Sequence, residues 1–352
     1  MRVYFIAHGN DKVGMGHIMR TLSLAEAFRE CGHDVSFFSR YKQGLDIITN
    51  KGFDVKKLPE QNSDIERPGF FYGSQEELER DPDVISDELA EQPDIIVLDS
   101  YNVTALYLER LRNLTKCLVY IDDLNAFSYP VDILINGTAS ADEMGYEEMQ
   151  EAKLLLGVKY NLLRKEFKEI AKRDVKRSIS DIIITTGNSD PLHMTEKLLR
   201  CLMYEKKFST HQYHVIVGTG FEKNIWMDKE IAENRHIFLY DKPSNMPEIM
   251  LKCDMAVAAG GSTLYELAAC GVPAVVFAYA DNQLAQIKAL EKKGLLRYIG
   301  RYNEVDDRCL VENSIYLKDH FEYRKSMVRQ LQMLVDGNGT HRIVKKVEEW
   351  IS

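Results

Sequence analysis

The stretch VGMGHIMR at residues 13–20 separates an apolar segment from an amphipathic one, and this junction decides the fold. Residues 2–7 predict a buried strand, and the apolar residues between 18 and 28 recur at helical spacing. Gly14 and Gly16 allow the backbone to approach a ligand closely, and the N–H groups at a helix start suit a phosphate. The junction therefore predicts a strand, an anion-binding loop and a helix.

His17 distinguishes this loop from ordinary nucleotide-binding loops. Near a helix N-terminus the positive end of the helix dipole opposes a second ring proton, so we expect a neutral imidazole near pH 7. A neutral imidazole beside a bound phosphate is a candidate general base. His8 is a competing candidate, although its position places it in or at the rim of the first strand.

Length and composition predict a chain with a full hydrophobic core and two domains: 352 residues, 45% hydrophobic and 28% charged. The net charge of −9 argues against a nucleic-acid partner, because a phosphate backbone requires a basic face. An anionic substrate must then be bound by a local set of N–H groups.

The six cysteines lack the spacing of a metal site and predict reduced thiols in a cytoplasmic protein. We find no leader-peptide pattern and no apolar run near the ~20 residues that span a bilayer. No ligand set for a metal stands out, so we expect catalysis without a metal or cofactor. Met19 replaces the third glycine of a dinucleotide fingerprint, and the G-K-[ST], H-E-x-x-H and G-x-S-x-G motifs are absent from the sequence.

Short β-branched runs alternate with helical patterns along the chain, which predicts parallel sheets covered on both faces. The expected strands after the first are residues 35–39, 95–99, 118–121, 133–135, 182–186, 214–217, 237–239, 255–258 and 274–277. A highly charged break follows residue 160. The predicted class is α/β, with two doubly wound, Rossmann-like domains facing across a cleft. Their expected bounds are 1–165 and 166–335, and residues 336–352 form a helix that packs back on the first domain. The acidic segment 75–92 is interpreted as a solvated helix.

A second glycine loop, AAGGSTLYEL at residues 258–267, follows an expected strand. Thr263 and Glu266 have the spacing of a capping box, which would make this a structural helix start. Gly260, Gly261 and Ser262 exceed what a capping box requires, because their N–H groups and hydroxyls suit a diphosphate. A ligand site is the favoured interpretation.

A third loop, TTGNSDP at residues 185–191, also follows a strand. Asp190 as N-cap and Pro191 at the first helical position would explain a helix start without any ligand. The turn Gly187-Asn188-Ser189 is an equally good candidate for ligand contact. Further strand-end candidates either bind a ligand or cap the next helix: Asp99, Tyr101, Asp122, Asp123, Asp281, Asn282 and Gln283.

Taken in order, the motifs resemble one family of enzymes. They are Gly14-x-Gly16-His17-x-x-Arg20, Asp99-Ser100-Tyr101, Ile121-Asp122-Asp123-Leu124, the segments 133–136 and 155–167, Gly187 to Pro191, Gly260 to Glu266, Asp281-Asn282-Gln283 and Asp336-Gly337-Asn338-Gly339-Thr340-x-Arg342. The chain resembles the UDP-sugar hydrolases of pseudaminic acid biosynthesis and the related spore-coat polysaccharide proteins. These are relatives of the glycosyltransferase MurG, so the resemblance implies its two-domain GT-B architecture. Gly187-Asn188 stands where a double glycine is usual.

The resemblance also implies roles for individual residues. His17 matches the family's proposed base, which activates water for attack at the anomeric carbon. Glu266 matches the acidic residue that binds ribose hydroxyls, and Ser262 and Thr263 fall at the helix start that binds the diphosphate. Met246 lies near the expected uracil site. The remaining candidate contacts to a UDP-sugar are Gly14, Gly16, Arg20, Asp99, Tyr101, Asp122, Gly187, Asn188, Asp190, Gly261, Asn282 and Gln283.

The expected activity is hydrolysis of a UDP-linked diacetamido-trideoxy sugar, by an inverting and metal-independent attack of water. A MurG-like inverting glycosyltransferase is the alternative, in which an acceptor hydroxyl replaces water. A catalytically silent protein that binds nucleotide sugars is a further alternative. Kinship of fold does not determine the substrate.

Overall fold

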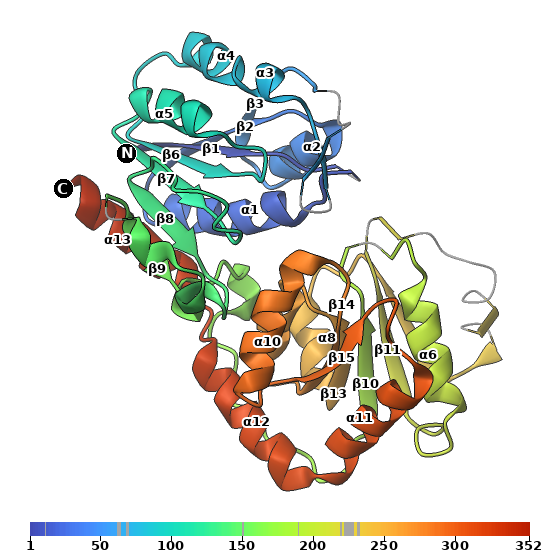
Figure 1. Cartoon of the computed structure of the whole chain (residues 1–352). Helices are drawn as coiled ribbons and strands as arrows, with labels where there is room; N and C mark the ends of the chain where they lie inside the picture. Colours follow the sequence, from blue (N-terminus) through green and yellow to red (C-terminus); the bar gives the residue numbers. More distant parts are fainter. Residues whose placement is uncertain are drawn as a thin grey trace. The chain divides into compact units, whose positions relative to one another are not determined.

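The computed structural model of the chain describes residues 1–10, 12–61, 65–67, 70–149, 151–188, 190–218, 220–221, 229–230 and 233–352. The structure divides into two compact units. Unit 1 comprises Met1–Lys165 and Asn338–Ser352, and unit 2 comprises Glu166–Gly337. Each unit contains one large parallel sheet with helices, which confirms the expected α/β class (Figure 1).

Unit 1 is built on a seven-stranded parallel sheet with the order β3-β2-β1-β6-β7-β8-β9. The strands are β1 (Arg2–Ala7), β2 (Asp34–Ser39), β3 (Asp54–Lys57), β6 (Ile95–Asp99), β7 (Cys117–Ile121), β8 (Ile133–Asn136) and β9 (Lys153–Leu156). The register pairs Ala7 with Asp99 and Asp99 with Ile121, so β1, β6 and β7 end side by side. Ligands of parallel sheets bind beyond such carboxyl ends.

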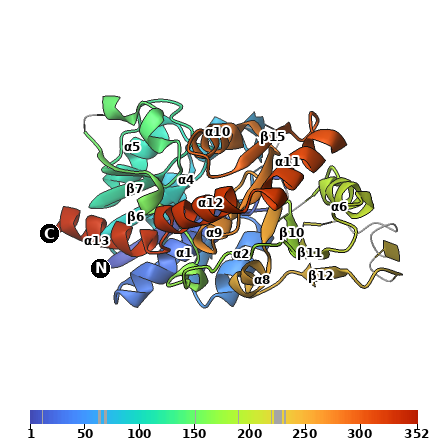
Figure 2. The same cartoon turned by 90° about the horizontal axis from the view of Figure 1, so that it is seen from below.

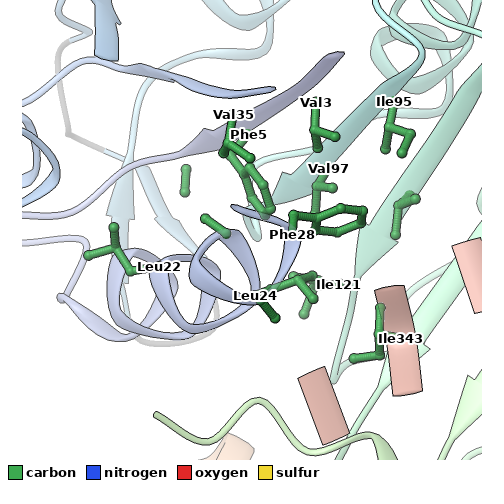
Figure 3. Packing of buried hydrophobic residues seen from close by; sticks show 14 of the residues in the cluster. Val3, Phe5, Leu22, Leu24, Phe28, Val35, Ile95, Val97, Ile121 and Ile343 are labelled. Carbon is green, nitrogen blue, oxygen red and sulfur yellow. The ribbon is translucent and has the colours of Figure 1, made fainter. Parts of the chain in front are cut away.

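The helices of unit 1 cover both faces of this sheet (Figure 1). They are α1 (Gly16–Glu30), α2 (Lys42–Asn50), α3 (Gln75–Leu78), α4 (Asp81–Glu88), α5 (Ala105–Asn113) and α13 (Gly339–Ile351). Figure 3 shows Phe28 of α1 and Ile343 of α13 in one cluster with Phe5 and Val97 of the sheet. Burial of each such side chain contributes about 1.5–3 kcal/mol to stability. Residues of α3, α4 and α5 join a second cluster with other residues of the sheet.

The last helix, α13, packs along α1 within unit 1, as Figure 2 shows from below. Ile343, Val344 and Val347 are fully buried there. Gly339, the first residue of the helix, packs directly on the backbone of Asn161: a Cβ at Gly339 would lie 2.1 Å from the carbonyl oxygen of Asn161. Only glycine fits at this position.

The prediction of a single solvated helix over residues 75–92 is wrong. Helix α3 begins with a capping box between Ser74 and Glu77, and a new helix begins at Asp81 with Pro82 in its first turn. Leu78 and Ile85 are buried in the core, so the two short helices are covering elements of the sheet. In the sequence, the short antiparallel pair β4 (Ile65–Arg67) and β5 (Phe70–Tyr72) comes after β3 and before these helices.

Unit 2 contains a six-stranded parallel sheet with the order β12-β11-β10-β13-β14-β15. The strands are β10 (Asp181–Thr185), β11 (Gln212–Val217), β12 (Ile237–Asp241), β13 (Met255–Ala259), β14 (Ala274–Ala278) and β15 (Arg297–Arg301). Its described helices are α6 (Met194–Tyr204), α8 (Met246–Lys252), α9 (Thr263–Ala269), α10 (Leu284–Lys292), α11 (Asp307–Asp319) and α12 (Phe321–Leu334). Helix α9 contacts α12, and α6 contacts α11 (Figure 2).

The neighbouring strands β10 and β13 carry the glycine loops of unit 2 at their carboxyl ends, and β14 beside them ends at the segment with Asn282 and Gln283. Across the described residues, no helix combines the length and the apolar character that crossing a membrane requires.

Candidate active site

His17 occupies the second position of α1 and is held by a buried carboxylate. Its Nδ1 lies 2.6 Å from Oδ1 of Asp99, the last residue of β6. His17 is only 5% exposed and Asp99 is fully buried. Because α1 follows β1 and β6 is the next strand in the sheet, the fold itself brings the ring to the carboxylate.

These contacts determine which ring nitrogen of His17 carries the proton in the neutral ring. An ionised carboxylate only accepts hydrogen bonds, so Nδ1–H donates to Asp99. The lone pair is then on Nε2, which lies 3.2 Å from the hydroxyl of Tyr72 and accepts its proton. Burial, reinforced by the charge of Asp99, raises the pKa of Tyr72, so this hydroxyl remains a donor. The ring thus has the tautomer of a base that accepts a proton at Nε2.

Arg20 lies one turn after His17 and joins two carboxylates. Its Nη2 donates to Oδ1 of Asp99 at 2.6 Å while Nε donates to Oδ2, and Nη1 donates to Asp123 at 2.7 Å. Burial alone would raise the pKa of Asp99, but the charge of Arg20 and the hydrogen bonds from Arg20 and His17 outweigh it and lower that pKa. Asp99 therefore remains ionised and orients both side chains, as a bidentate arginine–carboxylate pair does.

Aromatic side chains surround the His17 ring. Tyr101 packs edge-on to it with ring centroids 4.7 Å apart. Tyr72 belongs to a small buried cluster with Val13 and Tyr41, against which Tyr101 also packs. The sequence pattern identified Tyr101 but missed Tyr72, because the three-residue strand β5 has no periodicity that would mark it.

The Gly14–Gly16 loop differs from the anion-binding loop that we expected. The side chain of Asn10 accepts hydrogen bonds from the N–H groups of Lys12 and Val13, and its carbonyl accepts that of Gly14. Gly14 takes φ +84°, which closes this turn. The described N–H groups at positions 12 to 14 therefore stabilise the loop itself. A Cβ at Gly16 would meet nothing within 4 Å, so the start of α1 is open.

Asp122 lies in a different cluster from His17. Its carboxylate accepts hydrogen bonds from the hydroxyls of Tyr146, at 2.5 Å, and Tyr129, at 3.1 Å, and from the N–H of Asn125. It is 1% exposed, and its neighbour Asp123 binds Arg20 instead. These contacts favour Asp123 as a member of the candidate site and a supporting role for Asp122 in the following loop, and we propose this arrangement.

Substitution of Asp122 tests whether this residue has a supporting role rather than a role in ligand binding. We expect Asp122→Ala to lower the free energy of unfolding by about 2–4 kcal/mol, because two buried tyrosine hydroxyls lose their acceptor. The affinity for UDP should not change. Chemical denaturation and titration calorimetry measure the two quantities, with Glu147→Ala as an exposed carboxylate control. A loss of UDP affinity in a folded Asp122→Ala protein would restore Asp122 to the site.

In unit 2 the loop after β10 contains Gly187, a residue with positive φ, and its backbone packs closely against Gly218. Gly187 has φ +99°, whereas Asn188 is not among the residues with positive φ, so a side chain at position 188 causes no backbone strain. The carbonyl of Asn188 accepts the N–H of Gly220 at 3.0 Å. A Cβ at Gly218 would lie 2.2 Å from that same carbonyl oxygen, so Gly218 is a required residue that the motif search missed. Ser189 lies outside the described residues.

Asp190 has a capping role, but not at the position that the sequence predicted. Helix α6 begins at Met194, with His193 as its N-cap residue. The carboxylate of Asp190 accepts the N–H groups of Met194 and Thr195 at 2.9 and 2.7 Å. Pro191 therefore lies in the turn before the helix, because the chain turns at residues 191–193 first.

The capping box that we considered for Thr263 and Glu266 does not form. The N-cap residue of α9 is Ser262, which makes no side-chain capping bond, and Thr263 is the first helical residue. Ser262 is exposed. The structural explanation of this loop therefore fails, whereas an available Ser262 hydroxyl agrees with the ligand interpretation.

Gln283 links the glycine loop after β13 to the end of β14. Its Oε1 accepts the N–H of Tyr279 at 2.9 Å, and its Nε2 lies 3.8 Å from the position of a Cβ on Gly261. Asn282 precedes it in a short 3-10 turn. Met246 begins α8 with its side chain buried, after the N-cap residue Asn245. Among the described residues, no group of three His, Cys, Asp or Glu side chains is placed to hold a metal ion.

Comparisons with known proteins match this chain to a family model, to curated sequences and to solved structures. Residues 182–333 match the glycosyltransferase family 28 C-terminal domain. The chain is 27% identical over 78% of its length to an uncharacterized protein of Methanocaldococcus jannaschii, and spans 55% of that protein. It is 22% identical to the spore coat polysaccharide biosynthesis protein SpsG of Bacillus subtilis, over 99% of this chain and 98% of SpsG.

Two further comparisons concern an enzyme and a fold. The chain is 24% identical to the UDP-2,4-diacetamido-2,4,6-trideoxy-beta-L-altropyranose hydrolase of Campylobacter jejuni, over 84% of this chain and 97% of the hydrolase. The crystal structure of Acinetobacter baumannii MurG superposes with a TM-score of 0.66 at 12% identity, over 99% and 100% of the two chains. The chain is therefore a relative of SpsG and of the UDP-diacetamido-trideoxy-altropyranose hydrolases, with a GT-B fold like that of MurG.

Proposed function

We propose that the protein hydrolyses a UDP-linked diacetamido-trideoxy sugar, with His17 as the general base. The observation that carries this proposal is the His17 ring itself, whose Nδ1 is bound by Asp99 and whose Nε2 accepts a hydroxyl proton. A hydrolase of this substrate class among the relatives supports it. A general base of this kind contributes about 10²–10⁴-fold in rate.

The proposed reaction forms one bond and breaks one. The oxygen of water attacks the anomeric carbon, the bond from that carbon to the diphosphate oxygen breaks, and the water proton passes to Nε2 of His17. In the structure the Tyr72 hydroxyl donates its hydrogen bond to Nε2 and so marks where the O–H group of a water molecule would bind. UDP leaves with the electron pair of the broken bond, so attack from the opposite side inverts the anomeric configuration.

The loops of unit 2 are the proposed binding site for the nucleotide sugar. N–H groups at the Gly187 turn and at Gly261, together with the Ser262 and Thr263 hydroxyls, would stabilise the charge that develops on the diphosphate. The other proposed contacts are Asn188, Met246 near the base, Glu266 with the ribose hydroxyls, and Asn282 and Gln283 with the sugar. In unit 1 the proposed site residues are His17, Arg20, Asp99, Tyr101, Asp123 and Tyr72, with the Gly14–Gly16 loop before them.

The proposal predicts that UDP is released without any acceptor. The protein is incubated with a panel of UDP-linked 2,4-diacetamido-2,4,6-trideoxy sugars, and UDP and the free sugar are followed by mass spectrometry. In isotopically labelled water the label should enter the sugar and not UDP, and the first anomer observed by NMR should be inverted. Label in UDP would contradict attack at carbon, and no turnover of any panel member would contradict the substrate class.

A second candidate function is sugar transfer by the same site. The match to the glycosyltransferase family 28 C-terminal domain favours it, because that match covers most of unit 2, including the glycine loops at Gly187 and Gly260–Gly261. A transferase would release UDP only when an acceptor is added. A protein that binds UDP-sugars without turnover under either condition would instead be a binding protein.

A further inference from the structure

Tyr279 immediately follows β14 and connects this strand end to the turn after β10. Its hydroxyl donates to Oδ1 of Asp190 at 2.9 Å and accepts the N–H of Leu192 at 3.1 Å. Burial raises the pKa of Tyr279 and the charge of Asp190 adds to the rise, so the hydroxyl keeps its proton. A single side chain therefore binds both the capping carboxylate and the backbone of the turn at residues 191–193, which follows the Gly187 turn in the chain.

The backbone of Tyr279 holds a second loop. Its N–H donates to Oε1 of Gln283. A backbone N–H can only donate, so this contact fixes the orientation of the Gln283 amide. The Nε2 group consequently faces the loop at Gly261 as a hydrogen-bond donor.

Further residues at the start of α10 hold the same glycine loop. Nε2 of Gln286 donates to the carbonyl of Gly260 at 2.6 Å, and the hydroxyl of Tyr265 donates to Oε1 of Gln286. A Cβ at Gly260 would lie 2.2 Å from Ile287, so the backbone packs directly on α10. This loop therefore has its own supports, whereas the turn after β10 is tied to β14 through the Tyr279 hydroxyl.

The ring of Tyr279 has an independent anchor. It stacks on Tyr302, at the end of β15, with ring centroids 5.9 Å apart and planes inclined by 22°. A phenylalanine at position 279 keeps this stacking and the backbone contact to Gln283. Tyr279→Phe therefore removes only the two hydrogen bonds to the turn that contains Asp190.

We infer that Tyr279 is a positioning residue that holds the turn after β10 in register with the Gln283 loop, and so sets the affinity for the diphosphate of a nucleotide sugar. The inference rests on the proposed function of unit 2. Correct placement of N–H groups decides how well they bind an anion, and a small displacement weakens each contact. The hydroxyl contacts Asp190 and the N–H of Leu192, both within unit 2, so its loss should alter binding rather than chemistry.

The test compares Tyr279→Phe with Tyr213→Phe in the full chain. Tyr213 is a matched control: it is fully buried in unit 2, and its hydroxyl donates to the carbonyl of Phe208 at 2.9 Å. It lies near the start of β11, at the opposite end of the sheet from the loops. UDP binding is measured by titration calorimetry, KM and kcat with the UDP-sugar that turns over, and stability by thermal unfolding.

For Tyr279→Phe we expect Kd for UDP and KM to rise about five- to tenfold, as loss of a hydrogen bond to a charged group predicts, with kcat nearly unchanged. Tyr213→Phe should lower the unfolding temperature and leave both constants as in the parent. An unchanged Kd in Tyr279→Phe, or an equal rise in Tyr213→Phe, would overturn the inference while the proposed function stands. A parent protein that does not bind UDP at all would overturn both.

Discussion

His17→Gln should lower kcat by about 10²–10⁴-fold and leave the affinity for UDP close to that of the parent. Glutamine retains a hydrogen-bonding side chain toward Asp99 but has no nitrogen that accepts a proton near neutral pH. The loops of unit 2 that we propose to bind UDP are untouched by the change. Turnover of the UDP-sugar under saturating conditions measures kcat, and titration with UDP measures the affinity.

His8 is the matched control for this substitution. It is also buried in unit 1, at the end of β1, where its Nε2 lies 3.3 Å from Nη2 of Arg40. Burial, and then the charge of Arg40, hold the pKa of His8 well below its ordinary value. We expect His8→Gln to affect stability and leave kcat largely intact. If kcat fell in the His8 variant and persisted in the His17 variant, the base would be misassigned.

Asp99→Asn should lower kcat by about 10³-fold, because the neutral amide changes the tautomer of the ring. Both carboxylate oxygens of Asp99 accept hydrogen bonds from Arg20, and one of them also accepts from His17. An asparagine has only one oxygen, so its NH₂ group must face a donor, which is either Arg20 alone or His17 together with Arg20. When the NH₂ group faces His17, Nδ1 must accept its hydrogen bond and the ring proton moves to Nε2. A protonated Nε2 cannot accept the proton of water. Asp123→Asn is the control, because the ring contact remains, and its kcat should fall by less than about tenfold.

The effect of Asp99→Asn on the free energy of unfolding should depend on pH. The pKa of Asp99 is lowered in the folded protein, so its contribution is complete above the unfolded pKa and disappears as the pH falls through the folded one. Parent and Asp99→Asn should differ by about 1.5–3 kcal/mol at neutral pH. The difference should shrink below about pH 4. Denaturation curves across this range measure it, and a pH-independent difference would show that Asp99 is not ionised in the folded chain.

Strand prediction found every interior strand of the two large sheets but, of their four edge strands, only β12. The three missed strands of the two large sheets, β3, β9 and β15, are all edge strands. An edge strand needs fewer apolar residues, and Asp54–Lys57 is largely polar for this reason. Interior strands such as Ile95–Asp99 are buried at every position and therefore appear as continuous apolar runs.

The choice between two adjacent aspartates shows a limit of a different kind. Asp122 and Asp123 follow the same strand, and successive side chains of an extended chain point in opposite directions. One reaches Tyr146 and the other reaches Arg20. Neither partner adjoins the pair in the sequence, so the motif alone could not tell which aspartate meets which partner.

The sequence by itself determined the α/β class, the three strand–loop–helix junctions and the positions of His17, Arg20, Asp99 and Tyr101, because hydrophobic periodicity and turn residues are local properties. Only the tertiary structure decided what those residues contact. His17 meets Asp99 across 82 positions and Tyr72 across 55, and the carbonyl of Asn10 accepts the N–H of Gly14, which the glycine pattern assigned to a ligand. Hydrogen bonding saturates each donor and acceptor, so its outcome depends on which distant groups the packed sheet brings within reach.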